Sequence, residues 1–131
     1  MKTLKLNKKH YKLLFFVTAI VVFILATVGN DHIDINHQYA DKFKHITAFF
    51  TLSLLLNRSS STIQHRLRNM VSLLFFGFLI EVAQYFIPSR HSDWMDILAD
   101  FIGILLFQIS YSILKMIQEF NKRVKIEPKR L

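Results

Sequence analysis

Residues 80–103 read IEVAQYFIPSRHSDWMDILADFIG, and this stretch decides the fold. Its flanks are apolar enough to lie in a lipid bilayer, yet the stretch itself carries many polar side chains. Polar groups that face lipid are costly, so their concentration here needs a structural or functional explanation. The polar residues in question are Glu81, Gln84, Arg90, Asp93, Asp96 and Asp100.

The composition of the whole chain favours a membrane protein built from helices. Of its 131 residues, 52% are apolar, and the mean hydropathy is +0.30. Only three glycines and two prolines occur, which favours long helices over a turn-rich β fold. The chain has no cysteine, and this excludes disulfides, zinc–thiolate sites and iron–sulfur clusters.

The formal net charge of +8 would suit a nucleic-acid-binding protein if the basic residues formed one surface. They cluster instead at residues 2–12, 58–68 and 115–130, and apolar runs separate these clusters. Basic clusters that alternate with apolar runs are typical of the flanks of membrane-spanning helices. We therefore expect membrane lipids as partners and no nucleic acid.

The apolar runs predict an all-α membrane protein with four transmembrane helices. A span needs about 20 residues, and the first run meets this length with its flanks. A signal peptide is the competing interpretation of that run, but no clean small-x-small cleavage site follows it. The second run is the weakest, because Lys44 and His45 interrupt it. The four runs are Leu13–Val28, Phe43–Leu56, Met70–Ile87 and Trp94–Ile117.

Basic residues also predict the orientation of the four helices. Both ends of the chain and the second connection are basic, whereas the first connection carries aspartates and no Lys or Arg. Cytoplasmic segments are enriched in Lys and Arg, so the pattern predicts that both termini are cytoplasmic. The predicted organisation is a basic cytoplasmic N-terminus at 1–12, a membrane domain at 13–117 and a basic cytoplasmic tail at 118–131.

This orientation brings the polar residues together near the outer membrane surface. Asp41 and His45 share a helix face because they are four residues apart, and Glu81 and Gln84 share one because they are three apart. Asp100 lies six residues after Trp94, or roughly 9 Å along a helix. The candidate binding cluster comprises Asp41, Lys42, His45, Glu81, Gln84, Arg90, Asp93, Asp96 and Asp100.

Two contacts are expected inside this bundle. Gly77 and Gly103 lie on the polar faces of the third and fourth helices, so they predict a close contact between these two helices. Arg90 lies in the short connection between them and is expected to pair with Glu81, Asp93 or Asp96, because its planar fork bonds carboxylates well.

The residues also resemble a known family, the VanZ-like membrane proteins. DKFKH, from residue 41, resembles the D-K-x-x-H opening of that family. EVAQYFIPSRHSDWMDILADFIG, from residue 81, resembles its E-x-x-Q, its P-x-R-x-x-x-x-x-D and its closing small residues. The resemblance covers Asp41 to Gly103, and the family usually has Asn where this chain has Asp100. It marks as family positions Asp41, Lys42, His45, Glu81, Gln84, Arg90, Asp96 and Gly103.

The resemblance implies a multi-pass protein of the bacterial inner membrane. The family takes its name from a protein associated with resistance to the glycopeptide teicoplanin, so an effect on teicoplanin susceptibility is one expectation. The first functional hypothesis is binding of an anionic envelope molecule, either a lipid headgroup or a cell-wall precursor. Lys42, Arg90 and His45 would then hold its phosphate.

Two further functions stay open from the sequence. An enzyme that acts on a lipid headgroup would use His45 and the carboxylates, with Mg²⁺ or Ca²⁺ held by Glu81, Asp93 and Asp96. A subunit of a membrane complex would need the same groups only as an ion-paired scaffold. The sequence alone assigns no catalytic residue, no metal ligand and no cofactor.

Overall fold

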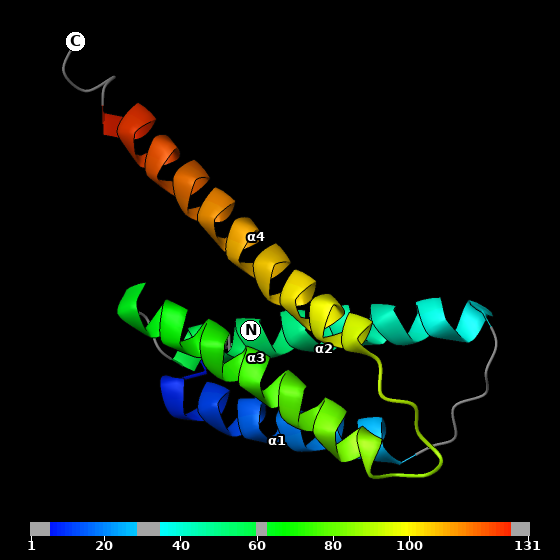
Figure 1. Ribbon diagram of the computed structural model, residues 1–131. Coiled ribbons are helices and arrows are strands. Elements are labelled where there is room, and N and C mark those ends of the chain that lie inside the picture. The colour runs from blue at the N-terminus through cyan, green and yellow to red at the C-terminus, as the bar shows by residue number, and fades with distance from the viewer. Residues whose placement is uncertain (1–5, 29–34, 60–62, 127–131) are drawn as a thin grey trace, which may run out of the picture.

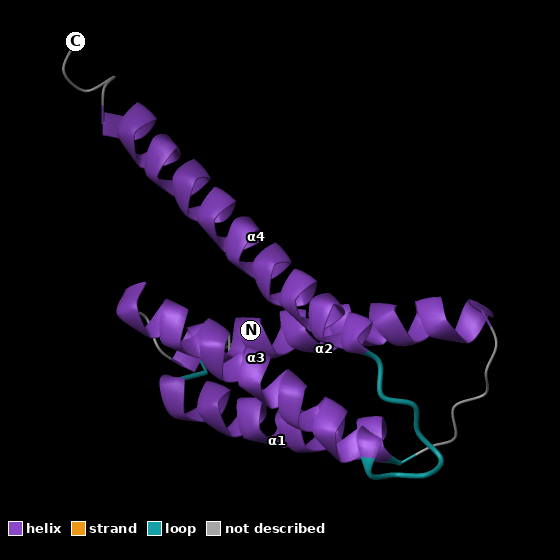
Figure 2. Cartoon of the chain, in the orientation of Figure 1, coloured by secondary structure: helices purple, strands orange, loops and turns teal. Residues whose placement is uncertain are grey.

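The chain forms four helices in a computed structural model that describes residues 6–28, 35–59 and 63–126 (Figure 2). This confirms the predicted all-α fold, and the described residues contain no strand. The predictions made for parts of the connections and for the chain ends fall outside these residues. The helices are α1 (Lys8–Thr27), α2 (Ile35–Ser59), α3 (Ile63–Tyr85) and α4 (Trp94–Ile126).

Local signals in the sequence set several of the helix ends. Asn7 caps α1, since its side-chain oxygen accepts a hydrogen bond from the His10 backbone N–H at 3.2 Å. Asp93 does the same for α4, and its Oδ1 accepts from the Met95 N–H at 3.0 Å. Pro88 follows the end of α3 closely and cannot continue a helix. A short connection therefore joins α3 to α4.

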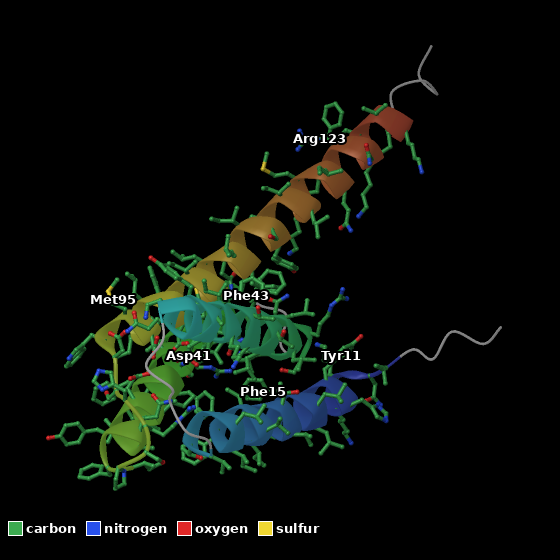
Figure 3. The ribbon with its side chains drawn as sticks, turned by 90° about the vertical axis from the view of Figure 1, so that its right-hand side faces the viewer. Tyr11, Phe15, Asp41, Phe43, Met95 and Arg123 are labelled. Carbon is green, nitrogen blue, oxygen red and sulfur yellow. The ribbon has the colours of Figure 1, made fainter. Side chains whose placement is uncertain are left out.

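Three helices lie side by side and the fourth crosses them. Figure 1 shows α1, α2 and α3 running roughly along one direction, while α4 starts beside α2 and then leaves the other helices. Arg123, near the far end of α4, lies well away from the other three helices in a second view (Figure 3). Helix α2 packs most extensively on α4 and next on α1. The end of α4 that contacts the bundle is thus its N-terminal part.

The buried core lies between α2, α3 and α4. It contains large apolar side chains from all three helices, whereas α1 has no buried residue and packs against the core from outside. Because lipid is as apolar as these side chains, close packing between the helices rather than removal from water stabilises this core. The core cluster is Phe49, Leu52, Leu73, Ile80 and Ile104.

The outer surface of the helices is largely apolar. Three of the described helices, α1, α3 and α4, are long and apolar enough to cross a membrane. Helix α2 does not meet this criterion, because its first half carries Asp41, Lys42, Lys44 and His45. Its apolar residues Phe49 and Leu52 are fully buried, so part of the apolar half of α2 faces the protein core. That α2 also crosses the membrane remains a prediction.

The glycine contact predicted between α3 and α4 is only partly correct. Gly77 of α3 does face α4, since a Cβ there would meet the Asp100 carboxylate and lie 3.3 Å from the Phe49 ring. Gly103 of α4, however, faces α2, where a Cβ would meet the carbonyl oxygen of Ile46. The close backbone approach therefore joins α2 to α4. Helical spacing could show that Gly103 lies on an interface but not which helix it meets.

Candidate functional site

The polar residues gather at one end of the bundle, which we call the polar end. It comprises the last turns of α1 and α3, the first half of α2, the first turns of α4 and the connection from Phe86 to Asp93. Figure 3 shows Asp41 on α2 and Met95 at the start of α4 in this part of the molecule. Polar side chains from α2, α3 and α4 lie in this part of the molecule, and their role as one binding site remains a prediction.

Lys42 is the basic centre of the polar end. Its ammonium donates to Oδ2 of Asp93 at 2.9 Å and to Oδ1 of Asp96 at 3.3 Å. Asp96 is only 2% exposed, so this contact offsets part of the cost of burying its charge. Lys42 thereby joins α2 to the first turn of α4 and remains partly open to the surroundings.

Asp93 carries out two structural tasks at once. Its carboxylate caps α4 and accepts a hydrogen bond from Lys42. The Lys42 hydrogen bond, followed by the bond from the Met95 backbone N–H, holds the pKa of Asp93 below its usual range. Both bonds favour the charged carboxylate, so Asp93 stays ionised at the entrance to α4.

His45 and Asp100 form the deepest polar pair. The ring nitrogen Nδ1 of His45 lies 2.7 Å from Oδ1 of Asp100, which is fully buried. An ionised Asp100 only accepts hydrogen bonds, so in that state the proton of the pair lies on Nδ1. The other nitrogen, Nε2, then points toward Asp96, whose Oδ2 is 3.8 Å away. The remaining oxygen of Asp100, Oδ2, has no hydrogen-bond partner among the described residues.

Glu81 is held by the connection that precedes α4. One oxygen, Oε2, accepts hydrogen bonds from the Asp93 backbone N–H at 3.0 Å and from the Ser92 hydroxyl at 3.2 Å. The other oxygen, Oε1, is buried and has no partner among the described residues. Sequence reasoning missed Ser92, because a hydroxyl in a polar connection gives no signal until the connection is folded.

Among the described residues, Arg90 makes no ion pair with Glu81, Asp93 or Asp96, the carboxylates that its position predicts. Its Nε donates to the Ala26 carbonyl at 2.7 Å and its guanidinium also reaches the Leu25 carbonyl at 3.3 Å. Gln84 donates to the same Ala26 carbonyl at 3.0 Å. The last carbonyls of a helix lack partners within the helix and carry partial negative charge, so they attract a guanidinium. Arg90 and Gln84 therefore fasten the end of α1 to the bundle.

This contact gives a direct prediction for Arg90→Ala. Loss of hydrogen bonds from a charged donor to the carbonyls of Ala26, which is half-buried, and Leu25, which is exposed, should lower the free energy of unfolding by about 1.5–3 kcal/mol. Thermal unfolding of the purified protein in detergent measures the change, with Arg68→Ala on the exposed face of α3 as the control. The control should unfold like the wild type. If Arg90→Ala also unfolds like the wild type, the role of Arg90 in attaching α1 is wrong.

The polar residues other than Gln84 and Arg90 form a second group, which we call the acid–histidine cluster. In this cluster carboxylates outnumber basic side chains. It is made of Asp41, Lys42, His45, Glu81, Asp93, Asp96 and Asp100. Its basic members are Lys42, which bonds Asp93 and Asp96, and His45, which bonds Asp100. Three of its five acids, Glu81, Asp96 and Asp100, are buried, and an ion-paired scaffold would not require more buried acids than bases.

The cluster contains one group of side chains with the spacing of metal ligands. Asp41, His45 and Asp96 each offer one ligand atom, and these atoms all lie within 4.8 Å of one another. The hypothesis of Mg²⁺ or Ca²⁺ on Glu81, Asp93 and Asp96 names a different set. Lys42 occupies one oxygen of Asp93 and the connection occupies one oxygen of Glu81, so that set is already engaged.

Comparison with protein-family models gives one match. The model of the VanZ/LLP1 family matches residues 2–115, which include all four helices up to the middle of α4. The chain belongs to this family. No curated protein and no solved structure matches it significantly. Together with its apolar helices, the match makes the chain a VanZ-like membrane protein.

The VanZ-like motifs fall on two groups of residues at the polar end, namely the acid–histidine cluster and the residues that contact α1. The D-K-x-x-H positions Asp41, Lys42 and His45 line one face of α2 and, with Asp96, belong to the acid–histidine cluster. The Gln84 and Arg90 positions belong to the α1 contact. The motifs of this VanZ-like protein therefore combine a candidate binding cluster with residues that attach the end of α1 to the bundle.

Proposed function

We propose that this VanZ-like protein is a multi-pass protein of the bacterial inner membrane whose polar end faces outward and binds an anionic envelope molecule. The ligand class is a phosphate-bearing headgroup, carried by a lipid or by a cell-wall precursor. One observation carries the proposal: buried carboxylates converge on Lys42 and His45 at one end of an otherwise apolar bundle. Ionisable groups at such a place are costly and are usually kept for function.

Lys42 is the group best placed to bind the phosphate. An ammonium has three N–H donors, and among the described residues two of its bonds go to Asp93 and Asp96. Its side chain is 28% exposed, whereas the carboxylate of Asp96 below it is 3% exposed. The two carboxylates thus fix the position of the partly exposed ammonium, whose third donor can meet a phosphate oxygen. Other carboxylates of the cluster can accept from sugar hydroxyls or an amine of the headgroup.

The test compares two lysines on the same helix. Lys42→Gln should weaken binding of anionic lipid about tenfold or more, because a hydrogen bond to a charged group contributes about 1.5–3 kcal/mol. Lys44→Gln removes the same charge from an exposed position and should change binding little. Binding is measured by native mass spectrometry of detergent-solubilised protein with phosphatidylglycerol, and separately with an undecaprenyl-phosphate lipid.

The two arms of that experiment distinguish a phospholipid headgroup from a cell-wall lipid carrier. Equal losses in Lys42→Gln and Lys44→Gln would mean that only net charge matters, and the proposed site would be wrong. Release of a modified or cleaved headgroup by the wild type would favour the enzyme alternative.

The orientation predicts the accessibility of introduced cysteines, which the native chain lacks. Cysteine at Ser89, in the connection between α3 and α4, should react with a membrane-impermeant maleimide added to intact cells or spheroplasts. Cysteine at Ser59, at the end of α2, should react only after lysis. The reverse pattern would turn the polar end toward the cytoplasm, and labelling of both sites from outside would remove α3 as a span.

An effect on teicoplanin susceptibility would follow indirectly from altered envelope chemistry. A deletion strain complemented with the wild type or with Lys42→Gln shows whether the site is needed for this effect. If only the wild-type gene returns teicoplanin susceptibility to the level of the parent strain, the site is linked to the antibiotic phenotype. If both genes do so, the phenotype does not depend on Lys42.

A further inference from the structure

We propose that the acid–histidine cluster binds one divalent transition-metal ion through Asp41, His45 and Asp96. The ligand atoms come from two helices, α2 and α4, and all lie within 4.8 Å of one another. An ion held at about 2.0–2.2 Å from each ligand keeps pairs of ligand atoms about 3–4 Å apart. The 3.8 Å between Nε2 of His45 and Oδ2 of Asp96 fits this spacing.

The orientation of His45 is a second and independent observation. Its ring is nine-tenths buried, and its Nδ1 is tied to Asp100 at 2.7 Å. The second nitrogen, Nε2, is directed at Asp96 but lies beyond hydrogen-bond distance from it. Metal-binding histidines commonly use this arrangement, in which a carboxylate holds one ring nitrogen and the other ligates. Asp100 is then a positioning residue and not a ligand.

The two oxygens of Asp96 have different surroundings. Oδ1 accepts from Lys42 at 3.3 Å, and Oδ2 faces His45. Lys42 thereby fixes the rotation of the carboxylate and leaves Oδ2 for an ion. Beside it, Oε1 of Glu81 is buried without a partner among the described residues, and Glu81 is close enough to Asp96 and His45 to interact electrostatically. A cation at this place would offset the local excess of negative charge.

The donor set indicates the kind of ion. One imidazole nitrogen with two carboxylate oxygens suits Zn²⁺ or Mn²⁺ better than Mg²⁺ or Ca²⁺, which prefer oxygen alone. Three protein ligands also leave a coordination position open. This last step rests on the proposed function: a phosphate oxygen of the headgroup can fill the open position beside Lys42. The binding of the ion itself does not depend on the headgroup.

Metal binding is tested on the full chain in detergent, without a purification tag and after treatment with a chelator. Titration with Zn²⁺ and with Mn²⁺, followed by isothermal calorimetry and elemental analysis, should give one ion per chain. Asp41→Asn and Asp96→Asn should each weaken binding tenfold or more. Asp41 is only half-buried, so Asp41→Asn should remain folded even if Asp96→Asn does not.

The control variants are His65→Ala and Glu119→Gln, which change a histidine at the other end of α3 and an exposed acid far along α4, outside the ligand set. Both should bind the ion within about threefold of the wild type. Pulsed EPR of bound Mn²⁺ should show coupling to an imidazole nitrogen that His45→Leu removes. Absence of stoichiometric binding, or equal affinity of Asp41→Asn and the wild type, would overturn the metal site. Because these titrations contain no lipid ligand, such a failure leaves the headgroup proposal to its own test.

Discussion

Replacing Gly103 with alanine should destabilise the bundle more than any other single-methyl change on α4. A Cβ at this position would meet the backbone carbonyl of Ile46, and a backbone group cannot move aside without shifting α2. Overpacking of this kind costs about 1–3 kcal/mol and sometimes more. The better helix propensity of alanine returns only about 0.8–1.0 kcal/mol. We therefore expect a net loss of stability.

Gly77→Ala is the informative comparison, because its added methyl meets side chains. A Cβ there would contact the Asp100 carboxylate and the tip of the Phe49 ring. Side chains can rotate by small amounts, so the global loss should be smaller than for Gly103→Ala. The movement of Asp100 should, however, disturb its bond to His45. Gly77→Ala is thus expected to affect the site more than the fold.

Unfolding in mixed micelles measures both variants, with Ile102→Ala as a control on the more exposed side of α4. A crosslink between cysteines placed on α2 and α4 reports whether the two helices still pack. If Gly103→Ala is as stable as the wild type, the backbones of α2 and α4 are farther apart than the structure places them. Equal losses for both glycines would remove the distinction between backbone and side-chain contact.

The helices themselves could be predicted from the sequence because long apolar runs and few breakers determine them locally. The run from Trp94 is a clear case, since Asp93 supplies its cap. Helix α2 is harder, as Lys44 and His45 interrupt its apolar run. Its place against α4 and α1 depends on side chains that are buried only after the bundle forms. The span assignment of α2 therefore cannot follow from hydropathy alone.

The acid–histidine cluster could also be predicted, because helical spacing and charge cost both point to it. The partner of Arg90 could not. Sequence places Arg90 near carboxylates, but the connection folds so that its guanidinium reaches Ala26 and Leu25 at the end of α1. Unpaired helix-end carbonyls occur in every helix and leave no mark in the sequence. Long-range backbone acceptors are thus missed by reasoning from side-chain charges.

The pair that separates a scaffold from a binding site is His45 and Asp100. His45→Leu removes the hydrogen-bond partner of a fully buried carboxylate whose second oxygen already has none among the described residues. Leaving a buried acceptor without its hydrogen-bond partner costs about 1–3 kcal/mol, and more when the group is charged. We expect this loss in the free energy of unfolding for His45→Leu.

Asp100→Ala in the same chain removes the orphaned carboxylate. The double variant His45→Leu/Asp100→Ala should therefore be more stable than His45→Leu alone, with an interaction energy of about 0.5–3 kcal/mol in the double-mutant cycle. Unfolding in detergent measures the cycle, and the native mass spectrometry described above measures anionic-lipid binding in parallel. A scaffold predicts that stability and lipid binding recover together, since only the buried charge matters. A binding site predicts recovered stability with binding still lost, because the imidazole that orients the cluster is gone. Full recovery of binding in the double variant would defeat the functional interpretation and leave an ion-paired bundle.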